Sequence, residues 1–372
     1  MDIRKDALVK WAKHCLEDMS GHGPVDGVIE TVSGDASFRR YFRIRLAKPM
    51  DIDEELVSEE IGRCLKSRQF LLVDAPPAHE DCRKFVAIAN MFRRAGLVTP
   101  RVIEVDYDHG YMLLEDFGDA LYLPALLQGG EEDALYSAAM DSLIALQAGA
   151  DCSTLPPYDR ALLRTEMALF DHWFCHQFLG INLSEQEQAL LDRTWTFLED
   201  SALAQPQVAV HRDYHSRNLM VRQEQVTLPP GVIDFQDAVV GANTYDLVSL
   251  LRDCYIVWPQ ERVTAWVQEF RKKAVAKGLL EKGDNLIEAA FMRDFDLMGL
   301  QRHIKVIGIF CRLYLRDGKR RYMFDVPVVI DYVLTVAAKY PEMSEFLLWL
   351  QNTLLPVAKQ KLAPILADED KA

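Results

Sequence analysis

Two short apolar runs between residues 208 and 240 restrict the fold more than any other part of the sequence. The first, Val208 to Val210, leads directly into a loop that is dense in polar groups, His211 to Asn218. The second, Gly231 to Ile233, ends at Asp234. A short apolar run bounded by polar residues is typical of a buried strand. The pattern therefore predicts two strand ends that carry polar groups into loops, inside a part of the chain that is otherwise helical.

The rest of the sequence changes character near residue 118. Apolar residues recur at helical spacing over residues 3–19, and strand signals then dominate as far as residue 115. These strand signals fall at residues 28–32, 38–46, 70–73, 101–106 and 111–115, with one helix between Phe85 and Gly96. We therefore predict that residues 1–118 form a small lobe with an antiparallel sheet.

Beyond residue 118 the periodicity is mostly helical. Helical patterns occur at residues 131–148, 160–179, 184–200, 260–275, 285–315 and 341–361. We predict an α+β fold in two lobes, in which residues 119–372 form the larger, mostly helical lobe. This lobe would carry the polar loop and the substrate site.

Composition excludes several classes of partner. The net charge of −14 repels nucleic acid and anionic membranes, so neither is an expected partner. The same charge suits cationic ligands, or serves solubility alone. Seven scattered cysteines without a Cys-x-x-Cys pair favour the reducing cytoplasm over a disulfide framework. The charged N-terminus predicts no signal peptide, and no apolar run is long enough to predict a membrane span.

The polar loop and Asp234 supply the groups that phosphoryl transfer requires. One carboxylate orients and deprotonates the attacking hydroxyl, while an amide and a second carboxylate hold Mg²⁺ against a triphosphate. Asn218 follows Asp213 by five residues, and Asp234 comes at a predicted strand end. This order is that of a kinase catalytic loop and its metal-binding aspartate.

Two other interpretations of the loop remain open. Isolated Asp, Asn and His residues in loops often make only turns and caps. His211, Asp213 and His215 are also spaced so that alternate side chains could bind a metal, as in some hydrolases. No further His-rich segment supports a metal site.

The turn from Ser33 to Phe38 is a candidate phosphate-binding loop. It lies between two predicted strands and contains Gly34, Asp35 and Ser37. Small residues let backbone N–H groups approach phosphate oxygens. An ordinary hairpin is the alternative.

Two further segments are candidates for supporting roles. Glu115 to Gly118, including Phe117, lies at the junction of the lobes, where a kinase hinge offers backbone groups to adenine; an ordinary interdomain turn is the alternative. Asp246 opens a helix with an apolar face. We expect Asp246 to cap or brace the polar loop rather than to react.

At these residues the sequence resembles the aminoglycoside phosphotransferase-like kinase superfamily, over nearly the whole chain. The motifs are His-x-Asp-x-His-x-x-Asn at His211 to Asn218, Ile233-Asp234-Phe235 and Tyr245-Asp246-Leu247. The resemblance implies a bilobal protein-kinase-like fold that uses ATP and Mg²⁺. It also implies that Asp213 is the catalytic base and that Asn218 and Asp234 are the metal ligands.

Finer features resemble the bacterial kinases that act on the anomeric hydroxyl of N-acetylmuramate and N-acetylglucosamine in peptidoglycan recycling. They are the stretches Gly34 to Arg43, Asp74 to Pro77, Leu114 to Asp119, His211 to Asn218 and Leu300 to Gly308. This resemblance implies an amino-sugar acceptor and a sugar 1-phosphate product. A kinase for another hydroxyl, such as an aminoglycoside or an amino alcohol, is a second interpretation. A catalytically weak nucleotide-binding scaffold is a third.

The sequence departs from the kinase pattern in the third strand. Kinases carry a phosphate-binding Lys there, whereas this strand reads Phe70-Leu71-Leu72-Val73-Asp74. Phosphate charge in a closed cleft needs a cation. We expect that Arg39, Arg40 or Arg43 supplies it, and a solvated strand face is the alternative. Residues 47–69 are also longer than a strand connection needs.

The lactyl carboxylate of N-acetylmuramate would need a cation in the helical lobe. Arg302, His303 and Lys305 lie on one predicted helix. We expect Arg302, His303 and the loop residue His215 to contact the substrate. A basic solvated face is the alternative, and His303 also shares a helix face with Ile307, which would direct it inward.

Overall fold

The structure is a computed structural model that describes residues 2–20, 24–32, 38–50, 57–223, 225–283 and 285–367. These residues form two compact units. Unit 1 comprises Met1–Leu121 and Leu219–Gln236, and unit 2 comprises Tyr122–Asn218 and Asp237–Ala372. The predicted division into residues 1–118 and 119–372 differs from this one, chiefly because it leaves the segment from residue 219 to 236 out of the first unit.

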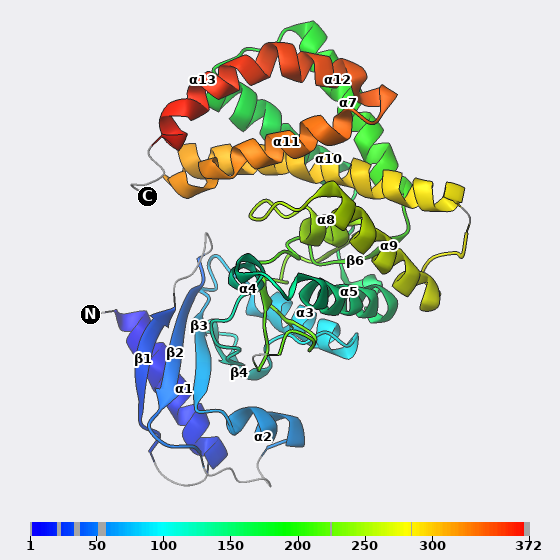
Figure 1. Cartoon of the computed structure of the whole chain (residues 1–372). Coiled ribbons are helices and arrows are strands. Elements are labelled where there is room, and N and C mark those ends of the chain that lie inside the picture. The colour runs from blue at the N-terminus through cyan, green and yellow to red at the C-terminus, as the bar shows by residue number, and fades with distance from the viewer. Residues whose placement is uncertain are drawn as a thin grey trace. The chain divides into compact units, whose positions relative to one another are not determined.

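Unit 1 is built on a five-stranded antiparallel sheet with the strand order β1-β2-β3-β5-β4. Its strands are β1 (Gly27–Val32), β2 (Arg40–Leu46), β3 (Gln69–Asp74), β4 (Val102–Asp106) and β5 (Tyr111–Glu115), and its helices are α1 (Ile3–Ser20), α2 (Glu59–Leu65) and α3 (Cys82–Arg94). The long segment from residue 47 to 69 contains α2. Figure 1 shows α1 lying along the sheet.

The two faces of β2 carry different side chains. Phe42, Ile44 and Leu46 are buried in one apolar cluster with the inner side of α1. Because successive side chains of a strand point to opposite faces, Arg40 shares the α1 face, whereas Arg43 lies on the other face. The Arg40–Asp74 ion pair lies on the α1 face, and the opposite face buries Val73, Met112 and Leu114. Both faces of the sheet therefore combine apolar packing with ion pairs.

The segment from residue 219 to 236 joins unit 1 through backbone hydrogen bonds. It contains the two short strands β7 (Leu219–Met220) and β8 (Gly231–Val232), which pair with each other. Val221 donates to the carbonyl of Ala120 and Val232 to that of Val98, both at 2.7 Å. Strands of two residues are too short to show an alternating pattern in the sequence. The sequence therefore did not indicate that residues 219–236 belong to unit 1.

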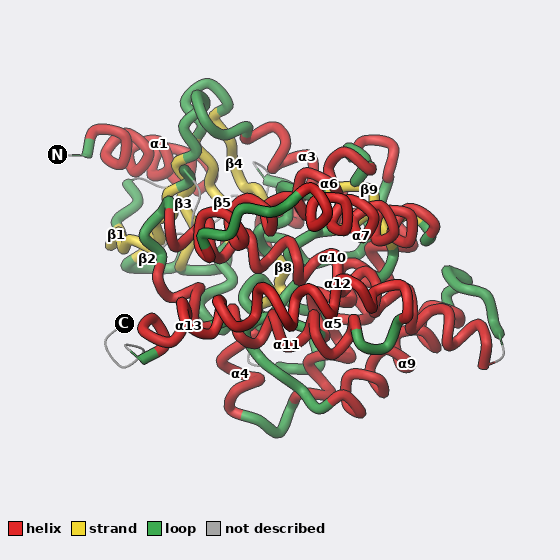
Figure 2. Tube along the Cα trace, turned by 90° about the horizontal axis from the view of Figure 1, so that it is seen from above, coloured by secondary structure: helices red, strands yellow, loops and turns green. Residues whose placement is uncertain are grey.

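Unit 2 is mostly helical, as the red tube of Figure 2 shows. Its α-helices are α4 (Tyr122–Gln128), α5 (Glu132–Gly149), α6 (Arg160–Leu169), α7 (Glu185–Ala204), α8 (Tyr245–Leu251), α9 (Gln260–Ala276), α10 (Asn285–Leu315), α11 (Val326–Ala337), α12 (Ser344–Trp349) and α13 (Leu355–Leu366). The π-helical segments are η2 (Phe170–Leu179) and η5 (Leu350–Leu354), the 3-10 turns are η1 (Cys152–Thr154), η3 (Arg320–Phe324) and η4 (Pro341–Met343), and the strands β6 (Gln207–Val210) and β9 (Val239–Ala242) pair antiparallel.

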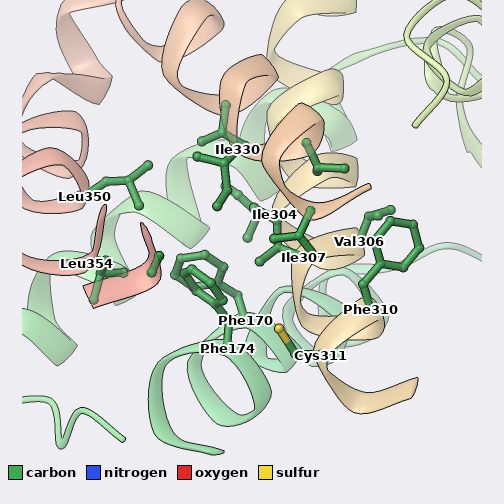
Figure 3. Packing of buried hydrophobic residues seen from close by; sticks show 14 of the residues in the cluster. Phe170, Phe174, Ile304, Val306, Ile307, Phe310, Cys311, Ile330, Leu350 and Leu354 are labelled. Carbon is green, nitrogen blue, oxygen red and sulfur yellow. The ribbon is translucent and has the colours of Figure 1, made fainter. Parts of the chain in front are cut away.

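The core of unit 2 surrounds α10. This helix is buried almost without interruption from Phe295 to Cys311. Figure 3 shows Ile304 and Ile307 of α10 among Phe170 of η2 and Ile330 of α11, all members of one apolar cluster. A helix that is enclosed on all sides has no solvated face, so the charged residues of its central part must find partners inside the protein.

These features confirm the predicted α+β class, with a small antiparallel sheet and a mostly helical remainder. All seven cysteines are free. Within the described residues, no helix combines the length and the apolarity needed to cross a bilayer.

Candidate active site

The loop from His211 to Asn218 follows β6 and is held by one buried carboxylate. Asp246, at the start of α8, accepts the backbone N–H of His211 at 2.7 Å and that of Arg212 at 3.0 Å. Arg212 has a φ of +79°, in the left-handed region that side chains other than glycine rarely adopt. The two hydrogen bonds fix this strained turn, so Asp246 braces the loop as predicted.

Hydrogen bonds within the loop direct the Asp213 carboxylate outward. The backbone N–H of Asp213 donates to Nδ1 of His211 at 3.2 Å. The carbonyl of Asp213 accepts Nδ2 of Asn218 at 2.9 Å and the backbone N–H of His215 at 3.0 Å. The side chain of Asp213 is nevertheless 45% exposed. The loop therefore has a rigid backbone and an accessible carboxylate.

Arg302 of α10 reaches the same loop from inside unit 2. Its Nη1 donates to the carbonyl of Arg212 at 2.8 Å and lies 3.8 Å from Oδ1 of Asp213. Removal from water alone would raise the pKa of Asp213, but the positive charges of Arg302 and then Lys305 outweigh it and lower that pKa to about 2. The carboxylate is therefore ionised at neutral pH and is a weak base.

Glu166 of α6 neutralises the cations behind the loop, a role that the sequence did not reveal. It pairs with Nζ of Lys305 at 2.9 Å and with the guanidinium of Arg212. Lys305 also donates to the hydroxyl of Tyr245 at 3.0 Å. Glu166 lies in an ordinary helical pattern far from the loop in sequence, so no local signal identified it.

The prediction that Arg302 and His303 contact the substrate is not supported. Arg302 is buried and belongs to the support of the loop. His303 is also buried, stacks on Tyr332 with ring centroids 4.7 Å apart, and has Nε2 3.1 Å from the carbonyl of Arg252. Burial lowers the pKa of His303 to about 3, which keeps the ring neutral. The predicted helix faces inward here because α10 is enclosed.

The end of the loop is held by a second acidic residue and bears an aromatic rim. Asp253 accepts the backbone N–H of Ser216 at 3.0 Å and also its hydroxyl. The ring of His215 meets that of Tyr255 edge-on, with centroids 5.5 Å apart, and the guanidinium of Arg217 lies 4.1 Å from the centroid of the same ring. Asp253 lies two residues beyond the end of α8, so helical spacing from Asp246 gave no signal for it.

Asp234 lies in unit 1, immediately after β8. Its φ of +63° is again in the left-handed region, and strained residues of this kind cluster at functional sites. The next residue, Phe235, is buried against Phe85 and Phe92 of α3, with ring centroids 4.9 and 5.9 Å apart. Nε2 of Gln236 donates to Oδ1 of Asp234 at 2.8 Å. Packing of Phe235 thus sets the position of the carboxylate.

The donor chemistry of Asn218 and Asp234 fits Mg²⁺. The amide nitrogen of Asn218 is committed to the carbonyl of Asp213, so its amide oxygen is the atom suited to a cation. Mg²⁺ prefers amide and carboxylate oxygens and usually keeps several waters and substrate phosphates as its other ligands.

A metal site at His211, Asp213 and His215 is not supported. The described residues contain no group of three or more His, Cys, Asp and Glu side chains placed to hold a metal ion. Nδ1 of His211 is also used as an acceptor for the backbone of Asp213.

The structure describes only some of the residues of unit 1 that were predicted to bind the nucleotide. Gly34, Asp35 and Ser37 lie outside the described residues. The carboxylate of Glu115 accepts the backbone N–H of Arg101 at 3.2 Å. The ring of Phe117 packs so closely on Gly231 that an added Cβ would approach it to 2.6 Å.

The structure does not support the prediction that Arg40 or Arg43 contacts phosphates, because both side chains form ion pairs with carboxylates. Arg43 is buried and pairs with both Asp116 and Asp119. Arg40 lies on the α1 face and pairs with Asp2 and with the fully buried Asp74. Both guanidinium groups are therefore neutralised by two carboxylates each.

Comparison with known proteins shows the family. The model of the phosphotransferase enzyme family matches residues 28–279. The chain is 40% identical over 348 residues to N-acetylmuramate/N-acetylglucosamine kinase from Pseudomonas putida, covering 92% of this chain and 95% of the relative.

Two solved structures share the fold at low sequence identity. The choline kinase from Cryptosporidium parvum has a TM-score of 0.55 and 12% identity, covering 95% of this chain and 99% of that one. The ADP-bound aminoglycoside phosphotransferase APH(2'')-Ib has a TM-score of 0.54 and 14% identity, covering 89% and 98%. The chain therefore belongs to the phosphotransferase enzyme family and is an enzyme that phosphorylates a hydroxyl acceptor.

Proposed function

We propose that this enzyme transfers the γ-phosphoryl group of ATP to the anomeric hydroxyl of N-acetylmuramate and N-acetylglucosamine, giving the sugar 1-phosphate. The choice of acceptor is supported by the name of the Pseudomonas putida relative, to which this chain is similar over almost its full length. The solved structures support only the fold, because their identity to this chain is too low to carry a substrate. The free cysteines favour a reducing compartment, and we place the enzyme in the cytoplasm.

The ionised Asp213 is suited to the role of base. Its carboxylate accepts the proton of the acceptor hydroxyl while that oxygen forms a bond to the γ-phosphorus. The bond between the γ-phosphorus and the bridging oxygen breaks, ADP leaves, and the proton passes from Asp213 to solvent. An anomeric hydroxyl is more acidic than an ordinary alcohol, so a weakly basic carboxylate is adequate.

The remaining groups position the reactants. Asn218 and Asp234 would hold Mg²⁺, which neutralises charge on the phosphates. Asp246 and Arg302 keep the backbone of the loop fixed, so that Asp213 needs no rearrangement when the acceptor binds. An arrangement braced in this way argues against a catalytically weak scaffold.

The roles of Asp213 and Asp234 can be separated by mutation. Asp213→Asn keeps the size of the side chain and removes the base, so turnover should fall by about 10²–10⁴, while calorimetry should show unchanged affinity for Mg·ATP. Asp234→Ala should instead weaken Mg·ATP binding. Asp200→Asn, an exposed carboxylate of α7, is the control. Near-normal turnover of Asp213→Asn, or unchanged Mg·ATP affinity of Asp234→Ala, would contradict these assignments.

Arg302→Gln should alter the pH dependence of the reaction. It removes the positive charge 3.8 Å from the Asp213 carboxyl, so the pKa of Asp213 should rise from about 2. Protonation then removes the base at a higher pH than in the wild type.

The measurement is the acid limb of kcat/KM, which should appear at higher pH in Arg302→Gln. Arg293→Gln, on the outer part of the same helix and paired with Glu342, should keep the wild-type profile. A lower rate with an unmoved acid limb would assign Arg302 a purely structural role.

The acceptor hydroxyl can be identified with blocked sugars. If C1 bears the reacting hydroxyl, the 1-O-methyl glycosides of both amino sugars should give no phosphorylated product, because no acceptor oxygen with a proton remains at that carbon. Kanamycin and choline serve as alternative acceptors in the same coupled assay. Activity that persists on a methyl glycoside, or that is confined to kanamycin or choline, would overturn the proposed acceptor while leaving the kinase assignment intact.

A further inference from the structure

Unit 1 contains an enclosed ion pair, Arg39 with Glu80. Arg39 immediately precedes β2, and Glu80 lies in the loop before α3. Nε of Arg39 is 2.9 Å from Oε2 of Glu80, and the two side chains are only 9% and 15% exposed. Charges withdrawn from water gain little net stability from pairing, so an enclosed pair of this kind is a candidate for a functional role.

The position of this pair follows from the alternation of β2. Arg39 and Arg43 share strand parity and therefore lie on the face opposite α1, as does Tyr41. Burial alone would lower the pKa of Arg39, but the neighbouring side chains of Tyr41 and Glu80 raise it. This face of the sheet also buries Val73 and Met112, and the sheet separates it from Arg40.

Asp234 lies close to the same place. Phe235, its neighbour in the chain, packs on Phe85 in the first turn of α3, five residues after Glu80. Burial raises the pKa of Tyr41, the positive charge of Arg39 opposes that rise, and the negative charge of Asp234 adds to it. The proposed metal ligand and the Arg39–Glu80 pair thus flank one region of unit 1.

A cation in this region could replace the phosphate-binding Lys that β3 lacks. In protein kinases a Lys on the third strand contacts phosphates and pairs with a Glu of the following helix. Here β3 reads Gln-Phe-Leu-Leu-Val-Asp. ATP carries more negative charge than one Mg²⁺ neutralises, and a planar guanidinium matches phosphate oxygens in two-point contacts.

We propose that Arg39, oriented by Glu80, contacts the phosphates of the bound nucleotide and takes the place of the missing Lys. Arg43 instead ties β2 to Asp116 and Asp119, and Arg40 ties it to α1 through Asp2 and Asp74. This inference rests on the proposed use of ATP as the donor.

Direct titration of the full-length protein tests the inference without turnover. The probes are the Mg²⁺ complex of a non-hydrolysable ATP analogue and adenosine, which lacks phosphates. Arg39→Ala should raise the Kd for the analogue by roughly tenfold to hundredfold, the loss expected for a charge-assisted hydrogen bond, and leave the Kd for adenosine unchanged. Glu80→Gln should have the same selectivity with a smaller effect, because Arg39 loses its orientation but not its charge.

Arg45→Ala is the matched control, since Arg45 lies on the same face of β2 but is 45% exposed and pairs with Glu30. Thermal melts of each variant report on folding. Wild-type affinity of Arg39→Ala for the analogue, or an equal loss for the analogue and adenosine, would overturn the proposal. If the wild-type protein does not bind the analogue, both the assignment of ATP as the donor and the role of Arg39 are overturned. A wild-type protein that binds it but leaves amino sugars unphosphorylated would overturn the acceptor alone.

Discussion

The bidentate contact between the Asp246 carboxylate and the backbone of His211 and Arg212 is the interaction on which the reactive loop depends. It holds Arg212 in a conformation that costs free energy of order 1–3 kcal/mol in an unrestrained chain. From that turn, hydrogen bonds within the loop hold the backbone of Asp213 and occupy the amide nitrogen of Asn218. The chemistry therefore depends on a residue that would touch neither substrate.

Electrostatics in both units follows one rule, which is that a buried charge has a partner. In unit 2, Glu166 compensates Arg212 and Lys305, and Arg302 remains close enough to Asp213 to keep it ionised. In unit 1, Arg43 is enclosed by two carboxylates, and Arg39 faces Glu80. Arg43, with two carboxylate partners, stabilises the fold, whereas Arg39, with Glu80, is the cation that we propose to contact phosphate.

The sequence predicted features that have a local signal. The spacing of strand and helix signals predicted a small antiparallel sheet followed by a mostly helical part. The place of Asp246 at a helix start led to its expected bracing role. The burial of Arg302 could not be predicted, because a charged residue on a helix looks the same whether the helix is solvated or enclosed. For His303, the face shared with Ile307 had offered the inward orientation as an alternative. Only the packing of α10 by sequence-distant helices decides this. Glu166 was missed for the same reason.

The proposed reaction uses the ionised Asp213 as base and the anomeric hydroxyl as acceptor. The position of the phosphate ester in the product tests this reaction most directly. Proton–phosphorus correlation NMR of the product formed from N-acetylmuramate and Mg·ATP identifies the carbon that bears the phosphate. We expect three-bond coupling between the phosphorus and the anomeric proton. Coupling to the C6 protons or to a proton on another ring carbon, with none to the anomeric proton, would contradict the proposed reaction.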